Sequence, residues 1–388
     1  MGLMHNYARL PVAFVHGEGV WLQDSDGRRY LDALAGIAVC GLGHSHPAVT
    51  RALQEQAGRL LHTSNLYRIP AQEWLAETLC TISGLDGAFF CNSGAEANEA
   101  AIKIARLHGH AKGIAEPRIL VFSNAFHGRT MATLTATGNF KIQAGFAPLL
   151  PGFLRAPYGD LATAQALVQA NPDLCAILVE PIQGEGGVRP APEGFLAGLR
   201  ALCNDADILL MLDEVQTGIG RTGQFFAYQQ LPGFLPDVLS LAKGLGNGVP
   251  IGAMLANARV APLFSPGKHG TTFGGGPLVC AVAQAVLDTM QQEAIPAQAA
   301  RMGAILRRKL RERLAAHPQV VDIRGMGLMV GIELRDKPEG LVERALEKAL
   351  LINVTAERVI RLLPPLIIQE GEIDLLVEGL VELLQERA

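Results

Sequence analysis

Lys243 is the residue of this 388-residue sequence best placed for nucleophilic chemistry. It follows the apolar run 237–242 and precedes a glycine-rich turn, 244–248. A lysine at the end of an apolar strand is poorly solvated, which lowers its pKa and leaves a neutral amine that can attack an aldehyde. Taken alone, the same position would also suit an ordinary solvated lysine.

Asp213 stands at the end of a second apolar run, 207–212. An acid at the mouth of a buried strand is typically functional, because a cation or metal must compensate its desolvation. The pattern also resembles the magnesium-binding half of a nucleotide hydrolase. That interpretation requires a GxxxxGK[ST] loop, and the sequence contains none.

A third feature is the small-residue turn Ser93-Gly94-Ala95, which joins an apolar run ending at Cys91 to a predicted amphipathic helix. The first amides of a helix lack intrahelical acceptors and attract anions, and these side chains are small enough to admit a phosphate. An ordinary serine N-cap explains the segment equally simply, and the segment alone favours that alternative.

Together the three features form the set that pyridoxal 5′-phosphate requires: a Schiff-base lysine, an acid that keeps the pyridine nitrogen protonated, and a phosphate site.

The segment 218–223 matches a dinucleotide-binding fingerprint, GxGxxG. It lacks the long helix and the strand-end acid that such a site needs, so an NAD-dependent dehydrogenase is a remote alternative.

The elements that position these residues indicate an α/β fold. Short apolar runs alternate with amphipathic stretches through the middle of the chain, which predicts strand and helix units around a mostly parallel sheet. Ligands bind beyond the carboxyl ends of such strands. The candidate strands are 88–91, 118–122, 175–180, 207–212, 237–242 and 251–256.

The two ends of the chain have a different pattern. Residues 12–35 predict short strands, and a helix follows Pro47. The last hundred residues or so predict helices over 298–315 and 372–386, with strands near 320–324 and 328–334. We expect a small α+β domain made from residues 1–50 and 290–388, packed beside a large cofactor-binding domain, residues 51–289.

The amino-acid composition argues against several classes of binding partner. The sequence has 33 Lys and Arg against 37 Asp and Glu without long charge blocks, which argues against nucleic-acid and membrane partners. Its six cysteines form no CxxC pair, the histidines lack a matching set of ligands, and no metal site is expected. No signal peptide or membrane span is evident, so we expect a cytoplasmic enzyme.

Several motifs, in the same order, resemble those of the class III aminotransferases, a family of fold-type I pyridoxal-phosphate enzymes. Within that family the resemblance is strongest to the acetylornithine aminotransferases, and it extends from about Tyr7 to the last helix. Gly276, Gly244 and Asn247 depart from the commoner pattern. The matching segments are 42–47, 92–99, 124–130, 180–187, 213–223, Lys243 and 269–275.

The resemblance implies roles for individual residues. Lys243 and Asp213 would be catalytic, bound to the cofactor aldehyde and to its pyridinium. Thr272 would reach the phosphate of the neighbouring subunit, which implies a homodimer with active sites at its interface. The other implied cofactor contacts are Ser93, Gly94 and Ala95 at the phosphate, Phe126 and Val215 on the two ring faces, Gln216 near the ring hydroxyl, and Glu214 beside them.

Four further residues are implied to bind substrate. Arg129 and Thr271 would contact an acylated amino acid, and Arg361 would grip an α-carboxylate, with Glu185 able to pair with it. The implied reaction converts N-acetylornithine, or a similar terminal amine, and 2-oxoglutarate into N-acetylglutamate semialdehyde and glutamate, in arginine biosynthesis. Ornithine, 4-aminobutyrate and succinyl-diaminopimelate aminotransferases remain alternatives, because short motifs define the cofactor better than the distal pocket.

Overall fold

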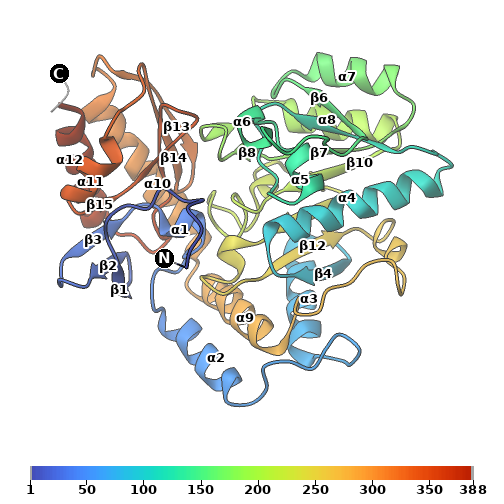
Figure 1. Ribbon diagram of the computed structural model, residues 1–388, viewed down its shortest axis with the longest axis horizontal. Coiled ribbons are helices and arrows are strands. Elements are labelled where there is room, and N and C mark those ends of the chain that lie inside the picture. The colour runs from blue at the N-terminus through green and yellow to red at the C-terminus, as the bar shows by residue number, and fades with distance from the viewer. Residues whose placement is uncertain (1, 386–388) are drawn as a thin grey trace.

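The computed structural model describes residues 2–385, and its larger lobe is built on a seven-stranded sheet (Figure 1). The strand order is β4-β12-β11-β10-β7-β5-β6, and only β12 runs against the direction of the others. This confirms the predicted α/β class. The strands are β4 Gly87–Cys91, β5 Arg118–Phe122, β6 Phe153–Ala156, β7 Leu174–Val179, β10 Leu209–Asp213, β11 Val238–Leu241 and β12 Gly252–Ala256.

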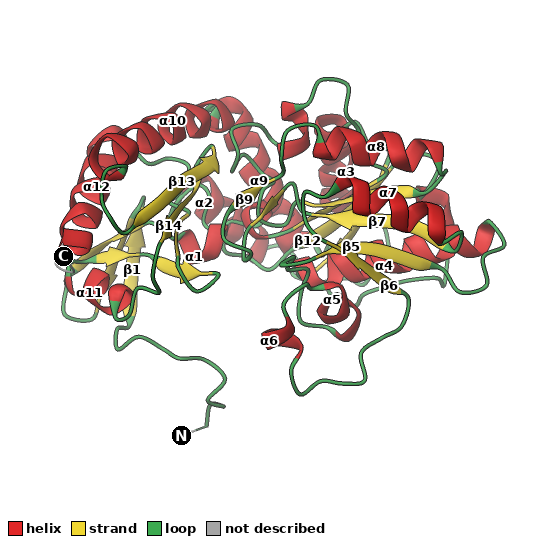
Figure 2. Ribbon diagram, turned by 90° about the horizontal axis from the view of Figure 1, so that it is seen from above, coloured by secondary structure: helices red, strands yellow, loops and turns green. Residues whose placement is uncertain are grey.

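Helices cover both faces of this sheet, as Figure 2 shows. Alternate residues of a strand point to opposite faces, so Ile119 and Val121 of β5 pack with α4 while Leu120 and Phe122 face the other layer. The helices are α2 Pro47–Ala57, α3 Pro70–Ser83, α4 Gly94–Ala111, α5 Met131–Ala136, α6 Phe140–Gln143, α7 Leu161–Ala170, α8 Phe195–Asp205 and α9 Pro277–Gln292, with 3₁₀ turns η1 Ala227–Gln230, η2 Lys243–Leu245 and η3 Ala261–Leu263.

The smaller lobe contains two further sheets. In the first, strands from the start of the chain pair with a strand near its end, in the order β1-β2-β3-β15; the second is the antiparallel sheet β13-β14-β17-β16. Its elements are β1 Phe14–Glu18, β2 Trp21–Asp24, β3 Arg29–Asp32, α1 Ala35–Ala38, α10 Ile295–Leu314, β13 Val320–Met326, β14 Met329–Leu334, α11 Leu341–Glu347, β15 Leu350–Leu351, β16 Asn353–Thr355, β17 Val359–Leu362 and α12 Glu370–Gln385.

A short hairpin, β8 Ile182–Gln183 and β9 Arg189–Pro190, lies near the junction of the lobes and carries the loop with Glu185. The predicted domain boundaries at residues 50 and 290 fall inside α2 and α9, which pack against each other. The predicted end of the last helix, residue 386, lies outside the described residues. Within residues 2–385, no helix is long and apolar enough to cross a membrane.

Candidate active site

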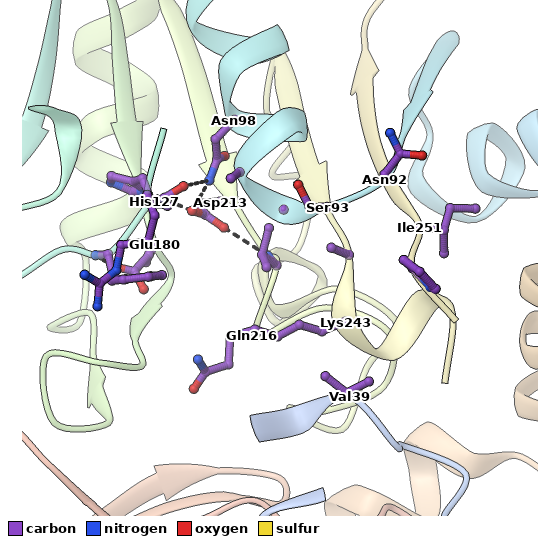
Figure 3. A pocket seen from close by; sticks show the side chains of 18 of the residues that line it. Val39, Asn92, Ser93, Asn98, His127, Glu180, Asp213, Gln216, Lys243 and Ile251 are labelled. Carbon is purple, nitrogen blue, oxygen red and sulfur yellow. Dashed lines mark hydrogen bonds and ion pairs between the residues drawn. The ribbon is translucent and has the colours of Figure 1, made fainter. Parts of the chain in front are cut away.

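A cavity of about 410 Å³ opens beyond the carboxyl ends of the parallel strands β7, β10 and β11 (Figure 3). These ends meet at one edge of the sheet, and Glu180, Asp213 and Lys243 stand there, one at each strand. The cavity thus brings together residues far apart in the sequence. The predicted site residues that line it are Ser93, Gly94, Ala95, Phe126, Arg129, Asp213, Val215, Gln216 and Lys243.

The start of α4 forms one wall of the cavity. The Ser93 hydroxyl accepts a hydrogen bond from the Glu96 amide at 3.2 Å, and the Glu96 carboxylate accepts one from the Asn92 amide at 2.7 Å. This reciprocal capping leaves the amides at the helix start directed at the cavity, where an anion is favoured. A Cβ on Gly94 would lie 2.6 Å from Val215 Cγ1, so only glycine fits between the helix start and Val215.

Asp213 is 4% exposed and is held by three neighbours. Oδ1 accepts a hydrogen bond from the Val215 amide at 3.0 Å; Oδ2 accepts one from Asn98 Nδ2 at 2.7 Å and lies 2.8 Å from His127 Nδ1. Among the described residues, no lysine or arginine forms an ion pair with Asp213. A buried carboxylate that lacks a strong cationic partner suits a ligand with a protonated ring nitrogen.

Lys243 follows β11 and points into the same cavity (Figure 3). Its φ of 46° is in the left-handed region, which costs about 1–2 kcal/mol for a residue with a side chain. Burial lowers the pKa of its ammonium group to about 8, although the charge of Glu185 opposes this shift. The amine is therefore far more reactive near neutral pH than a solvated lysine would be.

Glu180 was not among the predicted site residues, although it lies in a matching segment. It accepts hydrogen bonds from the Phe126 amide at 3.0 Å and the Gly184 amide at 3.3 Å, so it fixes the two loops that flank the ring site. Burial, reinforced by the nearby charge of Asp213, raises the pKa of Glu180 well above its usual range. The Arg129 guanidinium lies 5.7 Å from the centre of the Phe126 ring.

Asn98 and His127 were also missed as site residues. Asn98 donates to the His127 carbonyl at 2.8 Å as well as to Asp213, so one amide group ties α4 to the loop after β5 and to β10. Asn98 lies close after the phosphate turn in sequence, and His127 is adjacent to Phe126. These positions beside predicted cofactor contacts could have marked both residues as candidates for the site. Neither position predicts that the two side chains meet at Asp213.

Arg361 is buried and pairs with the partly exposed Glu185 just behind the cavity wall. Arg361 Nη1 donates to Glu185 Oε1 at 2.5 Å and to Gln216 Oε1 at 3.3 Å, and its Nε donates to Asn353 Oδ1 at 3.2 Å. Burial alone would raise the pKa of Glu185, but the charge and hydrogen bond of Arg361 outweigh it and lower that pKa. Gln216 connects this pair to the cavity.

The structure does not bring Glu214 into the cavity. Its buried carboxylate accepts hydrogen bonds from the Ala227 amide at 2.6 Å, the Tyr228 amide at 3.0 Å and the Thr217 hydroxyl at 3.0 Å. Burial raises its pKa to about 7. The Glu214 side chain therefore does not line the cavity: adjacent strand residues point to opposite faces, so Glu214 braces a loop while Asp213 faces the cavity, and a cofactor contact at Glu214 stays a prediction.

Thr271 and Thr272 also lie outside the cavity of a single chain. Thr271 Oγ1 accepts hydrogen bonds from Asn92 Nδ2 at 3.3 Å and from the Gly274 amide at 3.2 Å, and Thr272 is exposed.

The GxGxxG segment is followed by the short turn η1 rather than by a long helix. A Cβ on Gly223 would lie 2.8 Å from Ala300 of α10, so packing accounts for this glycine.

The residues around the cavity fit pyridoxal phosphate. Lys243 would supply an amine for the aldehyde, Asp213 an acceptor for the ring nitrogen, and Ser93, Gly94 and Ala95 a site for the phosphate. When bound, the cofactor supplies a ring that withdraws electrons from a bond to the substrate carbon.

Comparisons with known proteins agree with this geometry. The family described as Aminotransferase class-III matches residues 3–384. An acetylornithine aminotransferase of Nitrosomonas europaea is 55% identical over 97% of this chain and 95% of its own length. One of Aquifex aeolicus is 49% identical over 98% and 99%, respectively.

Solved structures are similar as well. An ornithine aminotransferase from Toxoplasma gondii superposes with a TM-score of 0.96 and 35% identity over 100% of this chain and 93% of that one. An N-acetylornithine aminotransferase from Stenotrophomonas maltophilia gives a TM-score of 0.86 and 36% identity over 98% and 97%. The chain therefore belongs to the class III aminotransferases and is a pyridoxal-phosphate-dependent enzyme.

Proposed function

We propose that the protein transfers the terminal amino group of N-acetylornithine to 2-oxoglutarate, giving N-acetylglutamate semialdehyde and glutamate, in arginine biosynthesis. The observation that carries the proposal is the buried Arg361, held by Glu185 behind the Lys243 cavity. Glutamate carries an α-carboxylate beside its reacting amine, and a guanidinium can bind such a group through two parallel hydrogen bonds.

The Glu185 pair accounts for two substrates in one site. Glutamate reacts at its α-amine, so its α-carboxylate lies close to the reacting atom. N-acetylornithine reacts at the far end of its chain. Glu185 neutralises Arg361 when no carboxylate lies there, and it must move aside when one binds. The Nζ of Lys243 then serves as general base and acid at the substrate carbon.

The walls of the cavity favour an acylated amine over free ornithine. Ornithine carries a second ammonium group that needs an acceptor. The carboxylates in the lining, Glu180 and Asp213, already accept hydrogen bonds from neighbours. Much of the remaining wall is apolar, as at Val39, Val249 and Ile251. Burying an unpaired ammonium there would be costly, whereas a neutral amide is tolerated better. The names of relatives at 46–55% identity agree with this preference.

Steady-state kinetics of the reconstituted enzyme test the substrate. We expect kcat/KM for N-acetylornithine to exceed that for ornithine by about a hundredfold, as burial of an unpaired polar group predicts. The panel also includes 4-aminobutyrate and succinyl-diaminopimelate, each with 2-oxoglutarate. A higher kcat/KM for any of these three would replace the proposed substrate.

We also propose that the enzyme is a homodimer. The loops before α3 and before α9, with the start of α3, present an apolar surface beside Thr272, and hydrogen bonds from Asn65 to the carbonyls of Thr271 and Gly274 join these loops. Such surfaces typically mark an interface. Its exposed members are Leu60, Leu61, Leu66, Tyr67, Trp74 and Phe273.

Light scattering tests the assembly. The double variant Leu61→Glu, Phe273→Glu is expected to be a monomer and to lose activity, because Thr272 then has no neighbouring phosphate to reach. The control is Leu375→Glu, which alters an exposed leucine of α12 in the smaller lobe. A dimeric, fully active double variant would contradict this interface.

We propose a cytoplasmic location, where the six free cysteines stay reduced.

A further inference from the structure

Asn247 is a buried side chain that the proposed reaction does not use. It lies in the turn after Lys243, is 8% exposed, and departs from the commoner class III pattern. Its Oδ1 accepts a hydrogen bond from the Leu42 amide at 2.7 Å, and its Nδ2 donates to the Gly43 carbonyl at 3.1 Å. The φ of Asn247 is 45°, a conformation that glycine adopts most easily, so these two bonds are the reason for a side chain at this position.

The partner of Asn247 is the segment 33–44, which belongs to the smaller lobe. Other parts of that lobe hold it, as the 2.7 Å hydrogen bond from the Leu363 amide to the Ala33 carbonyl illustrates. Within residues 2–385, the hydrogen bonds between this segment and the larger lobe are the two from Asn247. Asn247 therefore fastens a segment of one lobe to the cofactor turn of the other.

The middle of the segment 33–44 has an unusual backbone. Residues 35–38 all have φ values between 49° and 68°, and three of them carry side chains, for which this conformation is costly. Such a backbone persists only where surrounding contacts hold it. The next residue, Val39, lines the Lys243 cavity (Figure 3). The contacts that hold the segment thus also hold one wall of the cavity.

We propose that Asn247 is a positioning residue: by holding the Leu42 and Gly43 backbone, it keeps Val39 in place at the Lys243 cavity. The position of Val39 then sets how closely the cavity encloses the carbon chain of the acylated amine.

The two substrates depend on this wall to different extents. Glutamate gains an ion pair with Arg361, whereas Glu185 masks that arginine when the acylated amine binds. The acylated amine therefore relies more on apolar walls such as Val39. The inference rests on the proposed function, because it takes N-acetylornithine as the amine substrate.

Hydrogen–deuterium exchange of the cofactor-bound enzyme tests the anchoring without any turnover. The variant is Asn247→Gly, since glycine suits the φ of this position and only the two side-chain bonds are lost. Exchange of the Leu42 amide should become about tenfold faster or more, because this buried donor loses its acceptor.

The matched control is Asn257→Gly. Asn257 Nδ2 donates to Asp237 Oδ1 at 2.7 Å, and its Oδ1 accepts from the Val260 amide at 3.2 Å. It follows β12 directly, whereas the cavity is lined by Ile251, at the other end of that strand. This variant loses a similar pair of hydrogen bonds and should leave both Leu42 exchange and substrate binding unchanged.

Single-turnover rates of the two half-reactions give a half-saturation concentration for N-acetylornithine and for glutamate. Asn247→Gly should raise the first about fivefold or more and the second by less than about twofold, with limiting rates changed by less than about threefold. Asn247→Asp keeps an acceptor for the Leu42 amide but loses the donor to Gly43, so its effect should be intermediate. It serves in place of the glycine variant if that variant does not fold.

Val39→Ala supplies the second comparison. It should raise the half-saturation concentration for N-acetylornithine about tenfold, as the loss of apolar contact predicts. Adding Asn247→Gly to it should have no further effect, because the two residues act through one wall.

Three results would overturn the positioning role: unchanged exchange at Leu42, an equal rise for both substrates, or additive losses in the double variant. Failure of the proposed function is a separate result. It would show as a wild-type enzyme that does not favour N-acetylornithine over ornithine, and the exchange measurement would still decide whether Asn247 holds the segment.

Discussion

The reactivity of the Lys243 amine can be measured directly in the apoenzyme. Burial lowers the pKa of Lys243 from 10.5 to about 8. At pH 7 a group with a pKa of 8 is about one-eleventh neutral, whereas a group with a pKa of 10.5 is neutral in about one molecule in 3,000, a ratio of roughly 300. Only the neutral amine attacks an aldehyde, so the protein should capture the cofactor roughly 300-fold faster than a solvated lysine would.

The assay mixes apoenzyme with pyridoxal phosphate and follows the visible band near roughly 400 nm in stopped flow. Below about pH 8 the rate should rise about tenfold per pH unit, and above it the rate should level off, because the amine is then already deprotonated. Lys243→Ala should develop no band. A rate that still rises tenfold per unit between about pH 8.5 and pH 10 would refute the effect of burial.

The neighbouring charge supplies an internal check on the same measurement. The negative charge of Glu185 raises the Lys243 pKa, and the positive charge of Arg361 lowers it. Glu185→Gln removes the first influence and leaves the second, so the levelling-off should move to lower pH and the rate at pH 7 should increase. A shift toward higher pH would show that the amine responds to other groups.

Three further predictions test the site and the core. Gly94→Ala should weaken cofactor binding about tenfold in equilibrium dialysis, since its Cβ would crowd Val215, while Gly371→Ala, with open space around it, should not. Asp213→Asn should slow the glutamate half-reaction at least about a hundredfold, because a neutral amide no longer favours a protonated ring nitrogen; a change below threefold contradicts this. Leu75→Ala, at a fully buried position of α3, should cost about 2–5 kcal/mol in denaturant unfolding.

The strands of the large sheet were predictable because each is a local apolar run between polar turns. All six predicted strands are present, and their ends shift by two residues or fewer. The edge strand β6, Phe153–Ala156, was missed because it is short and contains Arg155. That side chain donates to the Phe122 carbonyl at the end of β5, at 3.0 Å, and to carbonyls at the end of α5, so tertiary contacts offset its polarity.

The chemistry of Lys243, Asp213 and the Ser93 turn was recognisable from the sequence because residue type and strand-end position are local properties. Their convergence at one cavity follows from a general rule for parallel strands. The direction of a side chain is different. Glu214 adjoins Asp213 and shares its chemistry, yet it faces the opposite side and binds loop amides. No local pattern distinguished the two.

By itself, the sequence determined the cofactor chemistry, the class of fold and the family, because all three depend on residue types that recur at short spacing. Only the tertiary structure decided which groups meet. Asn98 and His127 converge on Asp213, and Arg361 reaches Glu185 behind the cavity. These contacts join residues 86 to 176 positions apart, and they depend on how the elements of the larger lobe, and the two lobes, pack together.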